Sequence, residues 1–185
     1  DGEVGEDVTA NLRTIGSVPL RLRVDELPPV VEVRGEVYLR LAAFARLNEQ
    51  RLAAGHSAFV NPRNAAAGSI RQLDPRLAAE RPLDIWCYAI GYAEGLDLTD
   101  HLGALDWLRA AGFKVNPGIV LVDGIEEAAA ACRAWEARRG ELDYDIDGAV
   151  VKVDAYSLQR ALGSVAHDPR WAIAFKFAPT TVTTR

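Results

Sequence analysis

Two lysines stand inside apolar segments that should form strands, and they are the residues of this sequence with the clearest chemical potential. Lys152 lies in "GAVVKV" and Lys176 in "WAIAFKF". Alternate residues of a strand share a face, so Lys152 lies beside Gly148 and Val150, and Lys176 beside two alanines. Such faces predict a pocket in which the ammonium groups meet a flat, anionic ligand. The alternative is an exposed face with both lysines in water.

Lysine is scarce in this chain. Of its 21 basic residues 18 are arginine, and only Lys114, Lys152 and Lys176 are lysine. A compact, strongly hydrated ammonium group is not interchangeable with a planar guanidinium. Two of the three lysines lie in strand-like segments, which indicates positions that require an ammonium group. Lys114 follows "AAGF" and matches no motif.

The composition is that of a soluble globular domain. The 185 residues are 49% apolar and 25% charged, and no apolar stretch approaches the roughly 20 residues that span a bilayer. Cys87 and Cys132 stand alone in apolar segments, so we expect buried thiols, a reducing compartment and no zinc site. The net charge of −5, taken alone, argues against a nucleic-acid partner, although basic residues can still cluster on one face.

The order of elements predicts an α+β fold with antiparallel or mixed sheets and packed helices. Period-two alternation or short apolar runs predict strands at 17–23, 30–39, 83–92, 118–124, 148–153 and 171–177. Helical spacing with glycine or proline stops predicts helices at 40–55, 100–112 and 125–140, with shorter ones within 61–75 and at 155–162. In 31–39 the valines and Leu39 should share one face, and Glu36 should lie with Glu32, Arg34 and Tyr38 on the other.

Five segments in order resemble the bacterial NAD-dependent DNA ligases. The signatures are "VEVRGEVYL", "NPRNAAAGSIRQLDP", "DYDIDGAVVKVD" and "PRWAIAFKF", and the opening "DGEVGEDVTANLRTIGSVPL" resembles the segment that precedes them. The resemblance covers essentially the whole chain. It implies the nucleotidyltransferase part of the adenylation domain, a fold shared with ATP-dependent ligases and capping enzymes.

The resemblance also implies a reaction. In this family a lysine of a K-x-D-G signature attacks the α-phosphate of NAD, and a lysyl-AMP intermediate passes AMP to the 5′-phosphate of nicked double-stranded DNA before the strand is sealed. The implied cofactors are NAD and Mg²⁺, with zinc expected only in the full-length protein, outside this chain. The implied protein is a monomer in the bacterial cytoplasm, associated with the nucleoid during repair and replication.

Site residues follow from the resemblance position by position. Lys152 and Lys176 match the two lysines that hold and polarise the α-phosphate, and Glu36 matches the glutamate that contacts the ribose. Asp147, in "IDG", matches an acidic residue that orients a lysine or the metal. Tyr88 falls where an aromatic ring stacks on adenine.

The remaining matches complete the nucleotide and DNA contacts. Val150 is the expected wall of the adenine site opposite the aromatic ring. Arg63, Arg71 and Arg139 match basic residues that meet phosphates of the nucleotide or of nicked DNA. The alternatives are a core role for the aromatic residue, surface charges for Arg63 and Arg71, and a favourable helix C-terminal cation for Arg139.

The family's nucleophile has no match here. Asp1–Gly2 resembles the end of a later R-G-D-G turn, and Lys152, in "KVDA", is followed by alanine where the signature has glycine. We therefore expect 1–185 to be an adenylation domain truncated at both ends, without the domain that recognises nicotinamide mononucleotide and without the OB-fold, zinc-finger, helix-hairpin-helix and BRCT parts. Alone, it should not charge itself with AMP.

Three other classes of function are alternatives to the ligase. An NAD-linked oxidoreductase would need a G-x-G-x-x-G turn, which is absent. A hydrolase could use Asp143, Asp145 and Asp147, which share one face of an extended segment. A non-catalytic nucleotide- or nucleic-acid-binding module could use the arginines. Binding of AMP is required by the ligase interpretation but not by the hydrolase or by a nucleic-acid module.

Overall fold

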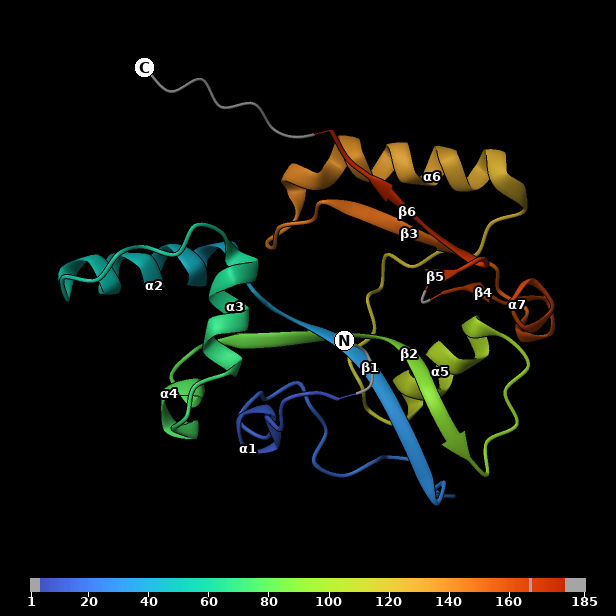
Figure 1. Cartoon of the computed structure of the whole chain (residues 1–185), viewed down its shortest axis with the longest axis horizontal. Helices are drawn as coiled ribbons and strands as arrows, with labels where there is room; N and C mark the ends of the chain where they lie inside the picture. Colours follow the sequence, from blue (N-terminus) through green and yellow to red (C-terminus); the bar gives the residue numbers. More distant parts are fainter. Residues whose placement is uncertain (1–3, 167, 179–185) are drawn as a thin grey trace. The chain divides into compact units, whose positions relative to one another are not determined.

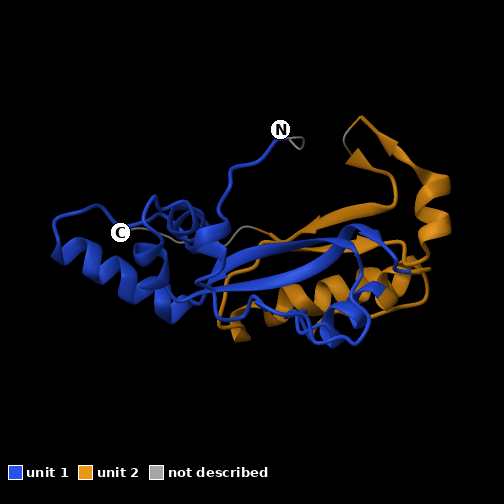
Figure 2. Ribbon diagram, turned by 90° about the horizontal axis from the view of Figure 1, so that it is seen from below, with its two compact units in different colours: residues 1–96, 104–117 blue, residues 97–103, 118–185 orange. Residues whose placement is uncertain are grey.

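The computed structural model describes residues 4–166 and 168–178. The chain divides into two compact units, residues 1–96 with 104–117 and residues 97–103 with 118–185 (Figure 2). The Asp1–Gly2 turn and the β-prone "TTVTTR" at 180–185 lie outside the described residues.

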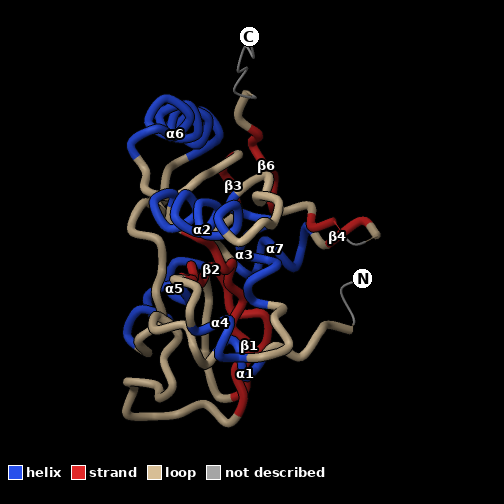
Figure 3. The backbone as a smooth tube through the Cα atoms, turned by 90° about the vertical axis from the view of Figure 1, so that its left-hand side faces the viewer, coloured by secondary structure: helices blue, strands red, loops and turns tan. Residues whose placement is uncertain are grey.

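The first unit is built on one long antiparallel strand pair, β1 with β2 (Figure 3). Its elements are α1 (Thr9–Leu12), β1 (Val30–Leu39), α2 (Leu41–Ala53), α3 (Pro62–Ile70), α4 (Pro75–Ala79), β2 (Leu83–Glu94) and the larger part of α5 (His101–Ala110). Helix α3 packs against β1. This close packing is possible because its inner face is alanine, with Ala65 and Ala66 fully buried.

Alternation along β1 and β2 places the core on one face of this pair. Leu39, Leu83, Ile85 and Cys87 are buried there, while Glu36 is exposed on the opposite face, as predicted. Burial raises the pKa of the Cys87 thiol to about 11, which is expected of a structural thiol that stays protonated at neutral pH.

The second unit contains a shorter ribbon of β3 (Gly148–Lys152) and β6 (Ala172–Lys176), and α6 (Gly124–Arg138) packs against β3 (Figure 1). Its other elements are η1 (Arg139–Glu141), α7 (Tyr156–Leu162), β4 (Ser164–Val165) and β5 (Asp168–Pro169). The small antiparallel pairs and packed helices confirm the predicted α+β fold class.

Two predicted strands are wrong. The backbone is irregular at residues 17–23, where a strand was predicted. It is also irregular from residue 118 to the start of α6 at Gly124. Pro19 lacks the N–H that a strand ladder needs, and Leu20 and Leu121 are exposed rather than packed. The alternating pattern of apolar residues does not by itself produce a strand, because a strand also needs a neighbouring strand to pair with.

Two of the described helices, α1 and α4, were not predicted. The sequence predicts a short helix that ends before Pro75, whereas Pro75 is the first residue of α4. Asp74 caps this helix through a hydrogen bond from Arg76 N to its Oδ1 atom at 2.9 Å, and proline is well tolerated at the first helical position. None of the helices in the described part of the chain is both long and apolar enough to cross a bilayer.

Candidate functional site

The register of β3 with β6 brings both predicted lysines to one face of the ribbon. Gly148 lies opposite Lys176, Val150 opposite Ala174, and Lys152 opposite Ala172. Directly opposed residues of an antiparallel pair project from the same face. The face therefore has a lysine at each end and only small or medium side chains between them.

Gly148 is required by the close approach of these two strands. A Cβ atom at this position would collide with the backbone carbonyl oxygen of Phe175. A flexible neighbour could move away, but a ladder carbonyl cannot move without disturbing the pairing. The glycine of "IDG" thus allows β6 to run beside β3 with Lys176 directly opposite.

The two ammonium groups have different surroundings. Lys176 Nζ donates to Asp147 Oδ2 at 2.9 Å, and both side chains are more than 60% exposed. Whether Asp147 orients a lysine during the reaction stays a prediction. Lys152 is partly buried, and its Nζ lies 3.5 Å from His101 Nε2. Burial lowers the pKa of Lys152 below the ordinary lysine value, because desolvation disfavours the ammonium form.

The middle of the face is open in the second unit. Val150 is 60% exposed and Ala174 is also exposed. An exposed valine on a strand of a folded domain is available to pack against a flat, apolar group. The predicted role of Val150 as one wall of a base-binding site is compatible with this position.

Glu36 lies in the first unit, on the face of β1 that is away from the core. Its Oε1 atom is 3.4 Å from Arg63 Nη2, and both side chains are well exposed. Arg71, at the end of α3, pairs with Glu6 at 3.2 Å and is also exposed. Exposed ion pairs of this kind contribute little to stability, so a phosphate or ribose could replace either carboxylate–guanidinium contact at low energetic cost.

Tyr88 occupies a β-bulge. The register of β1 passes from Ala89, opposite Arg34, to Cys87, opposite Gly35, so that Tyr88 is the extra residue of β2 at this point. Bulges change the direction of a side chain and are common beside functional sites. Tyr88 is 41% exposed, which argues against a role purely in the core.

Arg139, directly after α6, connects this end of the helix to the segment after β6 by a hydrogen bond. Its Nη1 atom donates to the Ala178 carbonyl oxygen at 2.9 Å, and Ala178 N donates to Glu136 Oε1 at 2.8 Å. Both contacts hold the backbone just beyond Lys176. A phosphate contact for Arg139 stays a prediction, and this structural tie is an additional role that the sequence did not indicate.

A polar cluster around Asp84 was missed by the sequence analysis. Asp84 is only 9% exposed, on the polar face of β2 opposite Tyr38. Its carboxylate accepts hydrogen bonds from Lys114 Nζ, from Ser17 Oγ at 2.7 Å and from Tyr38 Oη at 2.9 Å. An aspartate inside the apolar run "LDIWCYAIGY" was the available signal, because a buried carboxylate requires partners.

Lys114 and Arg40 are both cations beside Asp84, and the Arg40 Nη2 atom lies 3.3 Å from Asp84 Oδ2. The Lys114 Nζ atom lies 3.0 Å from Tyr38 Oη and 4.2 Å from the ring centroid of Trp86. The rings of Tyr38 and Trp86 stack with centroids 5.7 Å apart and planes 8° from parallel. Trp86 lies directly opposite Glu36 in the register. Lys114 thus lies between a carboxylate and two aromatic rings, where a compact ammonium group fits.

The electrostatics of Asp84 are dominated by two opposing effects. Burial alone would raise its pKa, but hydrogen bonds from Lys114, Ser17 and Tyr38, together with the backbone N–H of Ile85, lower the pKa well below the ordinary aspartate value. Asp84 is thus a stable anion at neutral pH, held by donors from several segments of the first unit.

The acidic run before β3 is not arranged as a metal centre. Within residues 4–166 and 168–178, no group of three or more His, Cys, Asp or Glu side chains could hold a metal ion. Asp143, Asp145 and Asp147 therefore do not form the metal-binding cluster that the hydrolase alternative needs.

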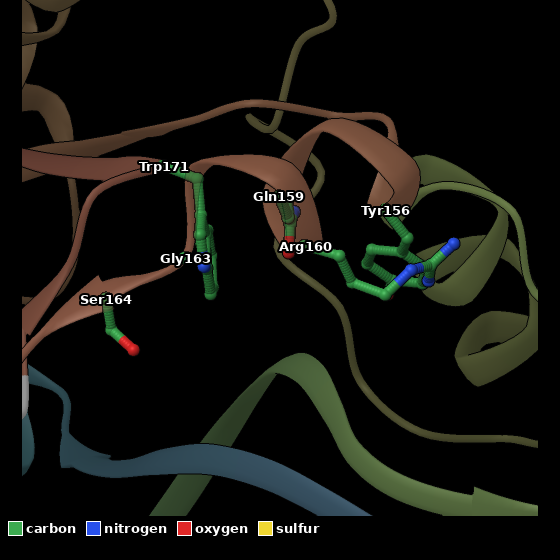
Figure 4. Close-up of a pocket in the computed structure, with 6 residues that line it drawn as sticks. All are labelled: Tyr156, Gln159, Arg160, Gly163, Ser164 and Trp171. Atoms are coloured by element: carbon green, nitrogen blue, oxygen red, sulfur yellow. The ribbon is translucent and has the colours of Figure 1, made fainter.

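A cavity of about 340 Å³ also lies in the second unit (Figure 4). Figure 4 shows the Arg160 side chain extending beside Tyr156 and away from Trp171. None of the predicted site residues lines this cavity, whose lining residues are Tyr156, Gln159, Arg160, Gly163, Ser164 and Trp171.

The described chain combines an α+β fold with an antiparallel ribbon that carries two lysines on one face, with only small or medium side chains between them. The sequence model of the family described as the NAD-dependent DNA ligase adenylation domain matches residues 1–180, and the chain belongs to this family. The resemblance found in the sequence motifs is confirmed.

Curated relatives agree with this assignment. The chain is 53% identical over 188 residues to a DNA ligase of Roseiflexus castenholzii, covering 96% of the chain and 26% of the relative. It is 51% identical over 195 residues to a DNA ligase of Chloroflexus aggregans (100% and 29%) and 54% identical over 179 residues to one of Desulforudis audaxviator (97% and 27%). The chain thus spans less than a third of the length of these relatives.

Proposed function

We propose that this chain is the nucleotide-binding part of an NAD-dependent DNA ligase, which takes AMP from NAD and passes it to the 5′-phosphate of nicked DNA. The observation that carries the proposal is the register of β3 with β6, which puts Lys152 and Lys176 on one face with only small or medium side chains between them. Membership of the adenylation-domain family supports the choice of an adenylyl group as the anion.

Lys152 and Lys176 bind the α-phosphate in this proposal and stabilise the negative charge that develops on its non-bridging oxygens during transfer. Phosphoryl transfer depends on positioning and on cations placed where charge develops. The partly buried Lys152 is well suited to this role, because a charge-assisted hydrogen bond is stronger where water is excluded. The exposed Lys176 would donate to the phosphate in place of Asp147, or donate to both groups at once.

The nucleoside is recognised by Glu36 at the ribose and by Tyr88 and Val150 at adenine. The exposure of all three side chains within their own units supports this assignment. Arg63 and Arg71 are proposed to contact DNA phosphates, and Arg139 a phosphate of the nucleotide or of DNA. Among the described residues, no group of three or more His, Cys, Asp or Glu side chains could hold a metal ion, and no step is assigned to Mg²⁺.

The attacking lysine is proposed to belong to a part of the ligase other than these 185 residues. Lys114 is engaged with Asp84 and two aromatic rings. Lys152 and Lys176 are assigned to the non-bridging oxygens, where a cation assists but cannot attack phosphorus in line with the leaving group.

Calorimetric titration of the 185-residue chain with AMP tests this proposal. We expect saturable binding that is weakened at least tenfold by Lys152→Ala or Lys176→Ala, since each removes a charge-assisted hydrogen bond to the phosphate. Adenosine should bind more weakly than AMP, and either substitution should change its affinity less than it changes that of AMP. Arg76→Ala is the matched control, because this arginine is 88% exposed and pairs only locally with Asp74. Absence of AMP binding, or equal affinity in all variants, would contradict the proposal.

A further inference from the structure

The contact between His101 and Lys152 places a second titratable group beside the partly buried lysine. His101 is the first residue of α5, and Lys152 is the last residue of β3. The His101 Nε2 and Lys152 Nζ atoms are 3.5 Å apart, at the long end of hydrogen-bond distances. Both residues belong to the second unit.

Backbone hydrogen bonds fix His101 in this place. His101 N donates to the Asp154 carbonyl oxygen at 2.9 Å, and Leu102 N donates to Asp154 Oδ1 at 2.9 Å. Asp100 forms an antiparallel bridge with Ala155. The start of α5 is therefore held against the chain that directly follows Lys152, and the imidazole is positioned by backbone rather than by a flexible loop.

The ring orientation is constrained as well. The Tyr156 ring meets the imidazole edge-on, with ring centroids 6.4 Å apart and planes at 76°. The phenol is partly buried, and burial together with the charges of Asp100 and Asp154 raises the pKa of Tyr156. Both carboxylates also accept backbone N–H groups of the first turn of α5.

The chemistry of the two groups decides how they can interact. A lysine ammonium has three donors and no acceptor, so a nitrogen that faces it must offer a lone pair. A neutral imidazole does so when Nε2 is unprotonated and Nδ1 carries the proton. An imidazolium has no acceptor, and its charge would repel the ammonium group.

We infer that His101 is a positioning residue: its neutral imidazole accepts a hydrogen bond from Lys152 through Nε2 and directs the ammonium group towards a bound phosphate. The phosphate role rests on the proposed function. A lysine side chain has many rotamers, and fixing one of its three N–H donors leaves the other two in a defined direction for the ligand.

Nitrogen NMR of the imidazoles in the 185-residue chain tests the hydrogen bond directly. The sequence has only three histidines, and His101→Leu assigns the signal. At neutral pH we expect Nε2 of His101 to have the shift of an unprotonated nitrogen, with the proton on Nδ1. In Lys152→Ala this preference should disappear. A proton on Nε2 in the unsubstituted chain would overturn the inference.

Two substitutions separate positioning from packing. His101→Gln keeps an acceptor at roughly the place of Nε2, whereas His101→Leu fills space without one. By calorimetry, we expect His101→Leu to weaken AMP binding about tenfold and His101→Gln to stay within about threefold of the unsubstituted chain. The exposed His56→Gln is the control. Equal loss in Gln and Leu variants with unchanged melting temperatures would show that the acceptor is not responsible.

The two measurements also distinguish failure of the inference from failure of the proposed function. If the unsubstituted chain does not bind AMP, the proposed function and the phosphate role of His101 fall together, while the imidazole spectrum still reports whether Nε2 accepts from Lys152. If AMP binds and the Leu variant retains full affinity, only the inference about His101 is wrong.

Discussion

Replacing Lys152 or Lys176 by alanine will slow adenylyl transfer at least about 100-fold in the complete ligase, equivalent to roughly 3 kcal/mol of transition-state stabilisation. Each substitution removes a cation aimed at oxygens that gain charge during transfer. The measurement is the rate at which adenylylated DNA forms in single-turnover reactions. The assay can use the Chloroflexus aggregans ligase with this chain in place of its matching segment.

Arginine should not rescue either position. A guanidinium is planar and larger than an ammonium group, and Lys152 already lies partly buried beside His101. Arg76→Ala serves as the control for loss of a surface cation. Transfer by Lys176→Ala at nearly the unsubstituted rate would refute the role given to that lysine.

Replacing Lys114 by methionine will lower the free energy of unfolding by about 2 kcal/mol. Methionine keeps much of the side-chain volume but leaves the buried Asp84 carboxylate without its ammonium partner. The loss is moderated because Ser17, Tyr38 and Arg40 still donate to Asp84. Urea denaturation followed by circular dichroism gives the value. Lys176→Met is the matched control, since its ion pair is exposed, and we expect a change below about 0.5 kcal/mol.

The effect of Lys114→Met should depend on pH. The pKa of Asp84 is lower in the folded chain than in the unfolded chain, where it is about 3.9. Ionised Asp84 therefore adds stability above about pH 4, and this contribution is lost as the pH falls below that value. The difference between Lys114→Met and the unsubstituted chain should accordingly shrink between pH 4 and pH 2. A difference that stays constant over that range would exclude Asp84 as the origin of the effect.

Strand alternation predicted the most informative part of the site. The period-two pattern placed Lys152 with Gly148 and Val150, and Lys176 with alanines, and the observed faces agree. The pattern could not establish that the face of β3 with Lys152 and the face of β6 with Lys176 lie on the same side of the ribbon. The common side depends on the register between β3 and β6, which pairs residues 20 to 28 positions apart in the sequence.

The scarcity of lysine draws attention to all three positions, but the sequence pattern indicates a role only for Lys152 and Lys176, which stand in strands. Lys114 lies in a segment that matches no motif. Its role depends on Asp84, Tyr38 and Trp86, which are distant in sequence and meet only in the folded unit. Single-sequence patterns report local periodicity, and such contacts between distant segments are beyond them.

Sequence patterns also could not predict the β-bulge at Tyr88 or the hydrogen bond from Arg139 to the Ala178 carbonyl oxygen. The position of Tyr88 was matched by resemblance, but its placement in a bulge depends on an extra residue in β2 relative to β1. Arg139 was expected at a phosphate, and its bond to the Ala178 carbonyl needs the segment after β6 to pass beside η1. Both features follow from how strands and helices meet, which no local rule specifies.

The central claim is that Lys152 and Lys176 together bind the phosphate of an adenylyl group. Only three lysines are present, so an NMR spectrum of the side-chain ammonium groups contains three assignable signals. On titration of the 185-residue chain with AMP, we predict that the signals of Lys152 and Lys176 shift together and saturate at one affinity, while that of Lys114 stays in place. A spectrum in which AMP moves neither signal, or moves that of Lys114 instead, would contradict the claim.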